Sequence, residues 1–216
     1  MATQRHIAIA GASGLVGHSI LLDALDDASV EEVHVLCRNP VKVSHPKLVE
    51  HLVDFQLIPP LPKISEVYLA VGTTMHQAGS REAFRNVDLE INLAVARAAV
   101  AAGAQRIGLV SAMAANPKSF FFYNRVKGEL EEALTTLAPE GLVIARPSLL
   151  LGDREALGQP IRLSETLTMY AGKVLGPLVP QNYRPIQAQN VARALLRHVP
   201  NADRKIVLCS GEMQPT

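Results

Sequence analysis

The chain has 216 residues, of which 48% are hydrophobic and 19% are charged, and its 21 basic and 20 acidic residues leave a net charge of +1. This length suffices for one domain with a buried core and at most a small second lobe. The apolar fraction excludes a disordered chain. The balanced charge provides no broad basic field for nucleic acid or membrane phosphate, so we expect no nucleic-acid partner.

The two cysteines and the apolar runs suggest where such a chain would reside. Cys37 and Cys209 lie far apart within apolar runs, which favours buried thiols in a reducing compartment over a disulfide. The first apolar run, Ile7–Ala10, is too short for the core of a signal peptide. No run approaches the roughly 18–20 apolar residues that cross a bilayer. We therefore expect a soluble cytoplasmic protein with no membrane-spanning segment.

Short β-branched runs alternate along the chain with longer runs of helical periodicity. In chain order, we predict a strand at Ile7–Ala10, a helix at Gly14–Ala24, strands at Val33–Cys37, Leu48–Val53 and Val67–Val71, a helix at Glu82–Ala102, a strand at Arg106–Val110, a helix at Tyr123–Ala138, a strand at Leu142–Ala145, helices at Leu163–Lys173 and Asn190–His198, and a strand at Ile206–Cys209.

This order predicts βαβ units, and hence an α/β fold with a Rossmann-type doubly wound parallel sheet. We expect residues 1–216 to form a single NAD(P)-binding domain. Pro and Gly become denser after Gly152. Residues 152–190 are therefore predicted to form a small irregular C-terminal lobe that contributes to a substrate site.

A glycine-rich turn follows the first predicted strand and opens the first helix: Gly11-Ala12-Ser13-Gly14-Leu15-Val16-Gly17. Gly11 would permit the tight turn, Gly14 would let a pyrophosphate approach the backbone, and Gly17 would let the helix pack closely. The helix N-terminus would offer free N–H groups to phosphates. Glycines also serve plain tight turns, but this position favours a dinucleotide site along the whole turn. No Gly-Lys-Ser/Thr follows, which argues against a P-loop.

The ends of the second and third strands suggest which dinucleotide would bind. NAD-selective sites usually carry an acidic residue after the second strand, where this chain has Arg38. A guanidinium suits a ribose 2′-phosphate, so we predict that NADP(H) is preferred over NAD(H). Asp54 ends the third strand and is followed by Phe55, which predicts an edge for the adenine ring. The alternatives are a surface arginine and a solvated loop acid.

A Tyr-xxx-Lys pair, Tyr123 and Lys127, lies on one face of a predicted helix. A Lys ammonium there favours the phenolate of Tyr123 and can hold ribose hydroxyls. The motif alone is weak, but it lies one helix after a strand that ends in Ser111. This order predicts that Ser111, Tyr123 and Lys127 meet at the carboxyl edge of the sheet. Ser111 could also be a plain strand-end residue.

These motifs together resemble the short-chain dehydrogenase/reductase superfamily, in its extended or atypical branch, over essentially the whole chain. Several further stretches are similar to the small NADPH-binding subfamily of the Tat-interacting protein: Val71-Gly72-Thr73-Thr74, Asn86-Val87-Asp88, Ala115-Asn116-Pro117-Lys118-Ser119, Phe122 to Glu129, and Arg146 to Arg154. Bacterial relatives of that subfamily are usually described as nucleoside-diphosphate-sugar epimerase-like.

The resemblance implies a role for each matching position. Tyr123 would be the general acid/base, Lys127 would bind the nicotinamide ribose, and Ser111 would hydrogen-bond the substrate. The cofactor would also be lined by Val71, Gly72 and Thr73 and closed over by Pro147, Ser148, Leu149 and Leu150. Asn86 receives no role. One departure concerns the third position after the strand, where Met113 stands and cannot donate a hydrogen bond.

The sequence predicts no metal site, because its seven histidines show no compact ligand spacing. The first functional hypothesis is an NADP(H)-dependent oxidoreductase of small carbonyl or alcohol substrates. The second is an NADPH-binding regulatory or interaction module with little turnover, and a weaker third is a nucleotide-sugar epimerase. The substrate, the stereochemistry, and a homodimer or other protein partner stay open.

Overall fold

The computed structural model describes residues 4–138, 140–153 and 180–214. Within these residues the chain forms a parallel sheet of seven strands in the order β3-β2-β1-β4-β5-β6-β9. The strands are β1 (Arg5–Ala10), β2 (Val30–Cys37), β3 (Leu48–Leu52), β4 (Glu66–Leu69), β5 (Arg106–Val110), β6 (Gly141–Arg146) and β9 (Lys205–Cys209). The predicted Rossmann-type doubly wound sheet is confirmed.

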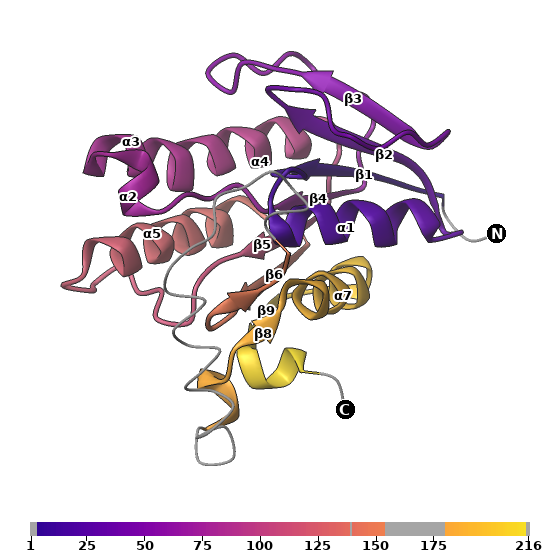
Figure 1. The fold of residues 1–216 in the computed structure, drawn as a ribbon. Coiled ribbons are helices and arrows are strands. Elements are labelled where there is room, and N and C mark those ends of the chain that lie inside the picture. Colours follow the sequence, from indigo (N-terminus) through magenta and orange to yellow (C-terminus); the bar gives the residue numbers. More distant parts are fainter. Residues whose placement is uncertain (1–3, 139, 154–179, 215–216) are drawn as a thin grey trace.

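Helices cover both faces of the sheet (Figure 1). On one face lie α1 (Leu15–Asp26) and α7 (Ala188–His198), and on the other lie α4 (Asn92–Ala101) and α5 (Phe122–Leu137). Two hydrophobic clusters follow from this arrangement, one under α1 and α7 and one under α4 and α5. Every residue of β4 is buried, as expected for a central strand covered on both faces.

The predicted helix Glu82–Ala102 is in fact three consecutive segments. They are α3 (Arg81–Arg85), a π-helical segment η1 (Asn86–Ile91) and α4. The sequence predicts one unbroken α-helix here because π-helical turns have no strong sequence signature. The π turn includes the buried Asp88 and ends beside the buried Asn92, and both side chains make contacts described below.

Short elements at the rim of the sheet were missed by the prediction. Helix α2 (Met75–Ala78) is capped by Thr74, whose hydroxyl oxygen accepts the Gln77 N–H at 3.1 Å. Strands β7 (Leu150–Leu151) and β8 (Ile186–Gln187) pair in parallel, but two-residue strands leave no periodic pattern. The expected helix Leu163–Lys173 and most of the expected lobe at 152–190 lie outside the described residues.

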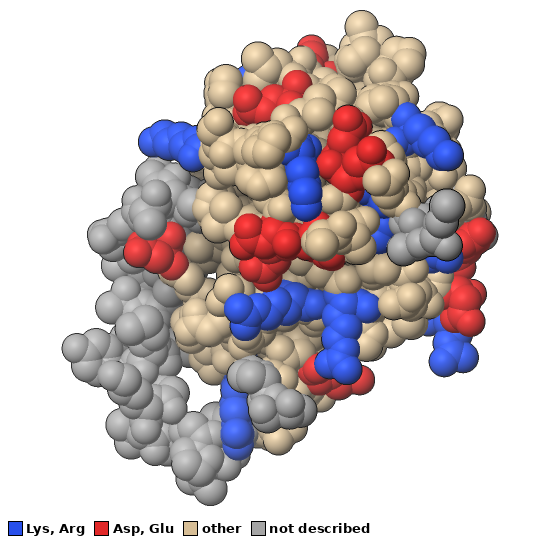
Figure 2. Space-filling view, turned by 90° about the vertical axis from the view of Figure 1, so that its right-hand side faces the viewer, with Lys and Arg blue, Asp and Glu red and all other residues tan. Residues whose placement is uncertain are grey.

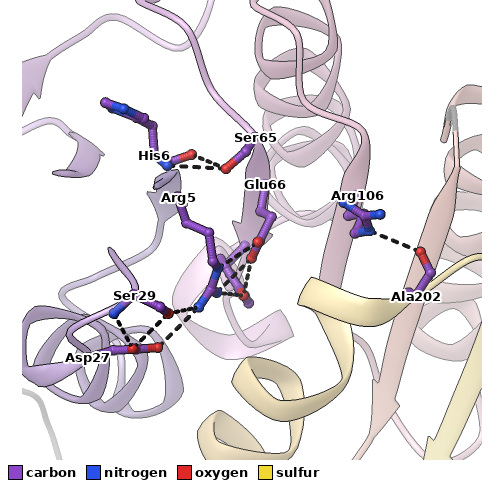
Figure 3. A network of polar contacts seen from close by, with 9 residues as sticks. Arg5, His6, Asp27, Ser29, Ser65, Glu66, Arg106 and Ala202 are labelled. Atoms are coloured by element: carbon purple, nitrogen blue, oxygen red, sulfur yellow. Dashed lines mark hydrogen bonds and ion pairs between the residues drawn. The ribbon is translucent and has the colours of Figure 1, made fainter. Parts of the chain in front are cut away.

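Polar side chains join the amino ends of the strands (Figure 3). Arg5 binds both carboxylate oxygens of Glu66, at 2.7 and 2.9 Å, and reaches Asp27 at 3.0 Å. Glu66 also accepts the phenolic O–H of Tyr68 at 2.7 Å, and burial raises the pKa of Tyr68 well above its ordinary value. These contacts join β1 to β4 and to the loop before β2.

The face of the molecule at the right of Figure 1 carries acidic and basic side chains close together (Figure 2). The amino ends of the strands point to this face, whereas the glycine-rich turn lies at their carboxyl ends. None of the described helices combines the length and the apolarity needed to cross a membrane.

Candidate functional site

A groove follows the carboxyl ends of β1 and β4, where the strand order reverses direction. Ligands of open α/β sheets bind in this crevice. A cavity of about 270 Å³ occupies one end, and hollows of about 390 and 180 Å³ continue from it. Val71 lines all three, so they form one groove across the sheet edge.

The glycine-rich turn forms one wall of the groove. Gly11 has a φ of +90°, and a Cβ there would lie 2.5 Å from the carbonyl carbon of Ala70. A Cβ on Gly17 would lie 2.1 Å from the carbonyl oxygen of Gly11. Because no other residue fits without moving the backbone, these two glycines set the close packing of β1, β4 and α1.

Helix α1 begins at this turn without a side-chain cap. Its N-cap residue, Gly14, makes no side-chain hydrogen bond, and the first turn carries no acidic residue. The first N–H groups of a helix lack intrahelical partners, and the helix dipole adds positive potential there. An uncapped helix start beside a groove suits the phosphates of a dinucleotide, so the residues present fit such a cofactor.

The far end of the groove contains the predicted arginine. Arg38 is exposed, follows β2 and lines both the 390 Å³ and the 180 Å³ hollow. Phe55 lines the smaller hollow with it. Asp54 does not line the groove; its carboxylate accepts the Gln56 N–H at 3.0 Å within a turn. The structure therefore brings Phe55 to the predicted adenine edge and leaves Asp54 outside it.

The Tyr-xxx-Lys pair lies at the other end, in the 270 Å³ cavity. The Tyr123 ring lies with its centroid 5.5 Å from that of Phe84, tilted by 47°, and the side chain stays partly exposed. Lys127 is buried, and its Nζ lies 2.7 Å from Asp88 Oδ1. Burial is the largest single influence and opposes the charge on Lys127, but the attraction of Asp88, Tyr123 and Glu131 together outweighs it and raises the pKa of Lys127.

Asp88, of the Asn86-Val87-Asp88 stretch, is a further residue of the site. Its second oxygen accepts the backbone N–H of Thr73 at 2.8 Å, so it joins η1 to the loop after β4. Asn92, one turn later, donates to the carbonyl of Val71 at 2.9 Å. Asn86 is exposed and lines none of the groove. Within the Asn-Val-Asp stretch, the buried Asp88 therefore belongs to the site and Asn86 does not.

Ser111 lines the cavity, but its hydroxyl already has a partner. It donates to Glu131 Oε1 at 2.5 Å, and Arg146 binds the same carboxylate at 3.0 Å through Nε and 2.5 Å through Nη2. Glu131 is buried one helical turn beyond Lys127. Glu131 and Arg146 were absent from the predicted site because they reach Ser111 from helix α5 and from the neighbouring strand β6, 20 or more residues away along the sequence.

The segment after β6 contributes less to the groove than predicted. Leu150 lines the cavity, but Pro147, Ser148 and Leu149 do not. The Pro147 carbonyl accepts the Met113 N–H at 3.1 Å, and the Ser148 hydroxyl donates to the Arg184 carbonyl. The Leu149 carbonyl accepts from Ile186 at 2.9 Å. These three residues anchor the strand end rather than cover the cavity.

Solved structures with the same arrangement of elements show how widely this fold occurs. No family model matches the chain. MoeE5 in complex with UDP-glucose and NAD superposes with a TM-score of 0.70 at 15% identity, covering 94% of this chain and 76% of that one. A short chain dehydrogenase family protein from Francisella tularensis subsp. tularensis SCHU S4 gives 0.69 at 14% identity, covering 97% and 99%. The chain therefore has the same Rossmann-type fold as these proteins.

Proteins related in sequence identify the family more narrowly than the solved structures do. The mitochondrial protein FMP52 of Candida albicans is 34% identical over 198 residues, which cover 87% of this chain and 85% of the relative. The corresponding Emericella nidulans protein is 32% identical over 162 residues, covering 69% of each. The chain belongs to the FMP52 family.

The relatives also correct the predicted location. The names of the FMP52 proteins describe them as mitochondrial, which contradicts the expectation of a cytoplasmic protein. That expectation was wrong because it rested on unpaired cysteines and missing apolar segments, and these features do not distinguish the cytosol from other reducing compartments.

Proposed function

We propose that the chain is an NADP(H)-dependent oxidoreductase that acts on a small carbonyl or alcohol substrate. The observation that carries this proposal is the continuous groove that joins Arg38 at one end to Tyr123 and Lys127 at the other. The glycine-rich turn and the uncapped start of α1 lie between these ends. The helix start would thus bind the pyrophosphate, with Arg38 placed on one side to contact a 2′-phosphate and Tyr123 and Lys127 placed on the other side near the reacting atoms.

The adenosine end would use Arg38 and Phe55. Arg38 is exposed and makes no hydrogen bond or ion pair with the described part of the chain, so its guanidinium is available for a forked contact with phosphate. Phe55 offers an apolar edge in the same hollow. The helix start supports the pyrophosphate between them.

At the reacting end, a bound nicotinamide would supply or accept a hydride. Tyr123 would give a proton to a carbonyl oxygen, or take one from a hydroxyl, because its partly exposed side chain borders the cavity. The Lys127 ammonium would hold the ribose hydroxyls of the cofactor. Asp88 fixes the position of that ammonium through the 2.7 Å ion pair.

Ser111 would have a narrower role than the resemblance implies. A serine hydroxyl has one donor hydrogen and two acceptor lone pairs, and the donor is engaged by the Glu131 carboxylate. Only the acceptor positions are left for a substrate. Ser111 would therefore accept from a substrate hydroxyl, which favours an alcohol contact over donation to a carbonyl.

The test is turnover of a panel of small aldehydes, ketones and quinones, followed by NADPH fluorescence. Tyr123→Phe should lower turnover by ~10²–10⁴-fold and leave the NADPH dissociation constant unchanged. Tyr183→Phe is the matched control, because Tyr183 is exposed and lines none of the groove. Full turnover in Tyr123→Phe would contradict the assignment of the acid/base.

Nucleotide preference is tested by binding. Wild-type protein should bind NADPH at least about tenfold more tightly than NADH, because one lost charge-assisted contact to phosphate costs about 1.5–3 kcal/mol. Arg38→Ala should remove the difference by weakening NADPH alone. Arg97→Ala, an exposed arginine on α4, serves as the control. Equal wild-type affinities for the two nucleotides would refute the preference.

A second function is an NADPH-binding regulatory or interaction module with little turnover, like the Tat-interacting-protein subfamily that the sequence resembles. The contact between Ser111 and Glu131 supports it, because it removes a hydrogen-bond donor from the cavity. Met113 supplies no replacement donor. Tight NADPH binding without turnover of any panel member would favour this module over the enzyme.

A further inference from the structure

A second cluster of chemically active side chains lies at the other end of the sheet, remote from the groove. His6 belongs to β1, and Glu32 and His34 belong to β2. One donor atom from each of the three lies within 4.8 Å of the others. The three residues come from neighbouring strands, which hold them more rigidly than loops would.

The donor distances match those of ligands around one metal ion. Glu32 Oε2 lies 3.2 Å from His6 Nδ1 and 3.2 Å from His34 Nε2. For a tetrahedral ion with ligand bonds of about 2.0–2.1 Å, neighbouring ligand atoms are separated by roughly 3.3–3.4 Å. The Glu32 carboxylate thus stands at ligand spacing from each imidazole nitrogen, while the two rings, with centroids 6.5 Å apart and planes inclined by 20°, would turn toward a shared ion.

His34 provides an independent indication of a ligand. It is only 2% exposed, and its Nε2 makes no hydrogen bond within the described residues, although Glu32 Oε2 is close. The two atoms are near each other without being aligned as donor and acceptor. This misaligned contact leaves a nearly buried ring nitrogen poorly satisfied, and coordination through the Nε2 lone pair would satisfy it.

The outer ring nitrogens of both histidines have partners of the kind that orient metal ligands. His6 Nε2 lies 3.2 Å from Glu31 Oε2, and His34 Nδ1 lies 3.0 Å from His51 Nε2. Such contacts hold a ligating imidazole in one orientation and tautomer. Each candidate histidine thus has one nitrogen directed to the cluster and one held from outside.

A strand irregularity produces this arrangement. The β1–β2 register changes between Arg5, which pairs with Val30, and His6, which pairs with Glu32. Glu31 is the extra residue, and the shift lets two consecutive glutamates approach the same imidazole. The His6 backbone is held by Ser65 through bonds of 3.1 and 2.8 Å, and its ring points away from them (Figure 3).

We propose that His6, Glu32 and His34 bind a divalent transition-metal ion, with Zn²⁺ as the ion that suits two imidazoles and one carboxylate. Water would complete the tetrahedron, because His6 and Glu32 are only partly buried. The proposal is independent of the nucleotide groove. It also revises the expectation of no metal site, which considered spacing along the sequence alone.

The experiment measures Zn²⁺ binding to protein without an affinity tag. After chelator treatment and removal of the chelator, Zn²⁺ titration against a competing chromophoric chelator should give one site per chain. Co²⁺ should give the visible absorption of a tetrahedral site. His6→Ala and Glu32→Gln should each weaken Zn²⁺ by at least about tenfold and abolish the Co²⁺ spectrum. His76→Ala and Glu82→Gln, which replace exposed residues outside the cluster, should behave as wild type.

Circular dichroism and thermal unfolding of each variant show whether it is folded. Zn²⁺ should raise the unfolding temperature of wild type and of both control variants, but not that of His6→Ala or Glu32→Gln. Glu32→Gln keeps the size of a partly exposed side chain, so it gives an interpretable result even if His6→Ala does not fold. Wild-type Zn²⁺ affinity in a folded Glu32→Gln, or less than one bound Zn²⁺ per wild-type chain, would overturn the proposal.

Discussion

Asp88 connects three parts of the chain at the end of the groove that Tyr123 and Lys127 line. It pairs with Lys127 of α5 at 2.7 Å and accepts from Thr73 after β4 at 2.8 Å. Both members of the ion pair are buried, so neither charge can be compensated by water if its partner is removed. At such a position the loss of one partner costs far more than the pair itself contributes.

Asp88→Asn should therefore destabilise the fold by ~3–5 kcal/mol at pH 7. In wild type the raised Lys127 pKa contributes stability that is present below the ordinary value of 10.5 and lost as pH rises through the folded value. In the variant, burial would instead lower the pKa of Lys127. The loss of unfolding free energy relative to wild type should therefore shrink between about pH 7 and pH 10, because the buried ammonium then loses its proton in the folded variant.

Urea unfolding at both pH values measures this effect. Asp203→Asn, at an exposed position, should change the unfolding free energy by less than ~0.5 kcal/mol. A deficit for Asp88→Asn that does not change with pH would show that the buried ammonium is not its cause.

At the scale of elements, α1 and the π-helical segment position the site in different ways. The packing of α1 rests on Gly17, where a Cβ would meet the Gly11 carbonyl oxygen at 2.1 Å. The segment η1 turns Asp88 inward within what is otherwise a continuous helical run from Arg81 to Ala101. The spacing of the glycines predicts the close packing of α1, but no pattern in the sequence indicates the π-helical turn.

Gly17→Ala should reverse the usual effect of this substitution. Within an exposed helix, alanine is more favourable than glycine by ~0.8–1.0 kcal/mol. Here the added methyl group would push α1 away from the turn, so we expect a loss of ~1–3 kcal/mol and weaker NADPH binding. Gly14→Ala meets its nearest atom at 3.3 Å and should cost less. Chemical denaturation of both variants measures the difference, and a more stable Gly17→Ala would contradict the packing argument.

At the scale of the molecule, the two edges of one sheet have separate roles. The carboxyl edge carries the groove, and the amino edge carries the Arg5–Glu66 network and the histidine cluster. A nucleotide in the groove would contact the β1–α1 turn, the end of β4 and α5 together. Because these parts belong to both layers of helices, binding should stabilise the whole fold rather than one segment.

NADPH at 100 times its dissociation constant should raise the unfolding free energy by ~2.7 kcal/mol. For a chain of this size, that corresponds to roughly 5–10 °C in the unfolding temperature. Differential scanning calorimetry measures the shift, and NADH at the same concentration should give a smaller one. Equal shifts in wild type and Arg38→Ala would argue against the 2′-phosphate contact.

Local sequence patterns predicted the order of the helices and strands and the elements on which the candidate site residues lie. The strand Arg106–Val110 was predicted with the bounds that the structure shows. The positions of Gly11, Arg38, Tyr123 and Lys127 around one groove followed from the rule that ligands bind at the carboxyl edge of a parallel sheet. Periodicity and turn chemistry act between residues close in sequence, so a single sequence reveals them.

Contacts between distant residues were decided by the folded arrangement. Glu131 accepts the Ser111 hydroxyl, and Asp88 forms an ion pair with Lys127. Phe55 lines the groove, whereas the neighbouring Asp54 does not. The histidine cluster likewise depends on a register shift between two strands. Each outcome depends on which side chains the sheet and its helices bring together, and spacing along the chain does not encode it. The sequence of 216 residues with balanced charge thus predicts the groove at the carboxyl edge of the sheet, whereas packing decides which side chains contact one another inside it.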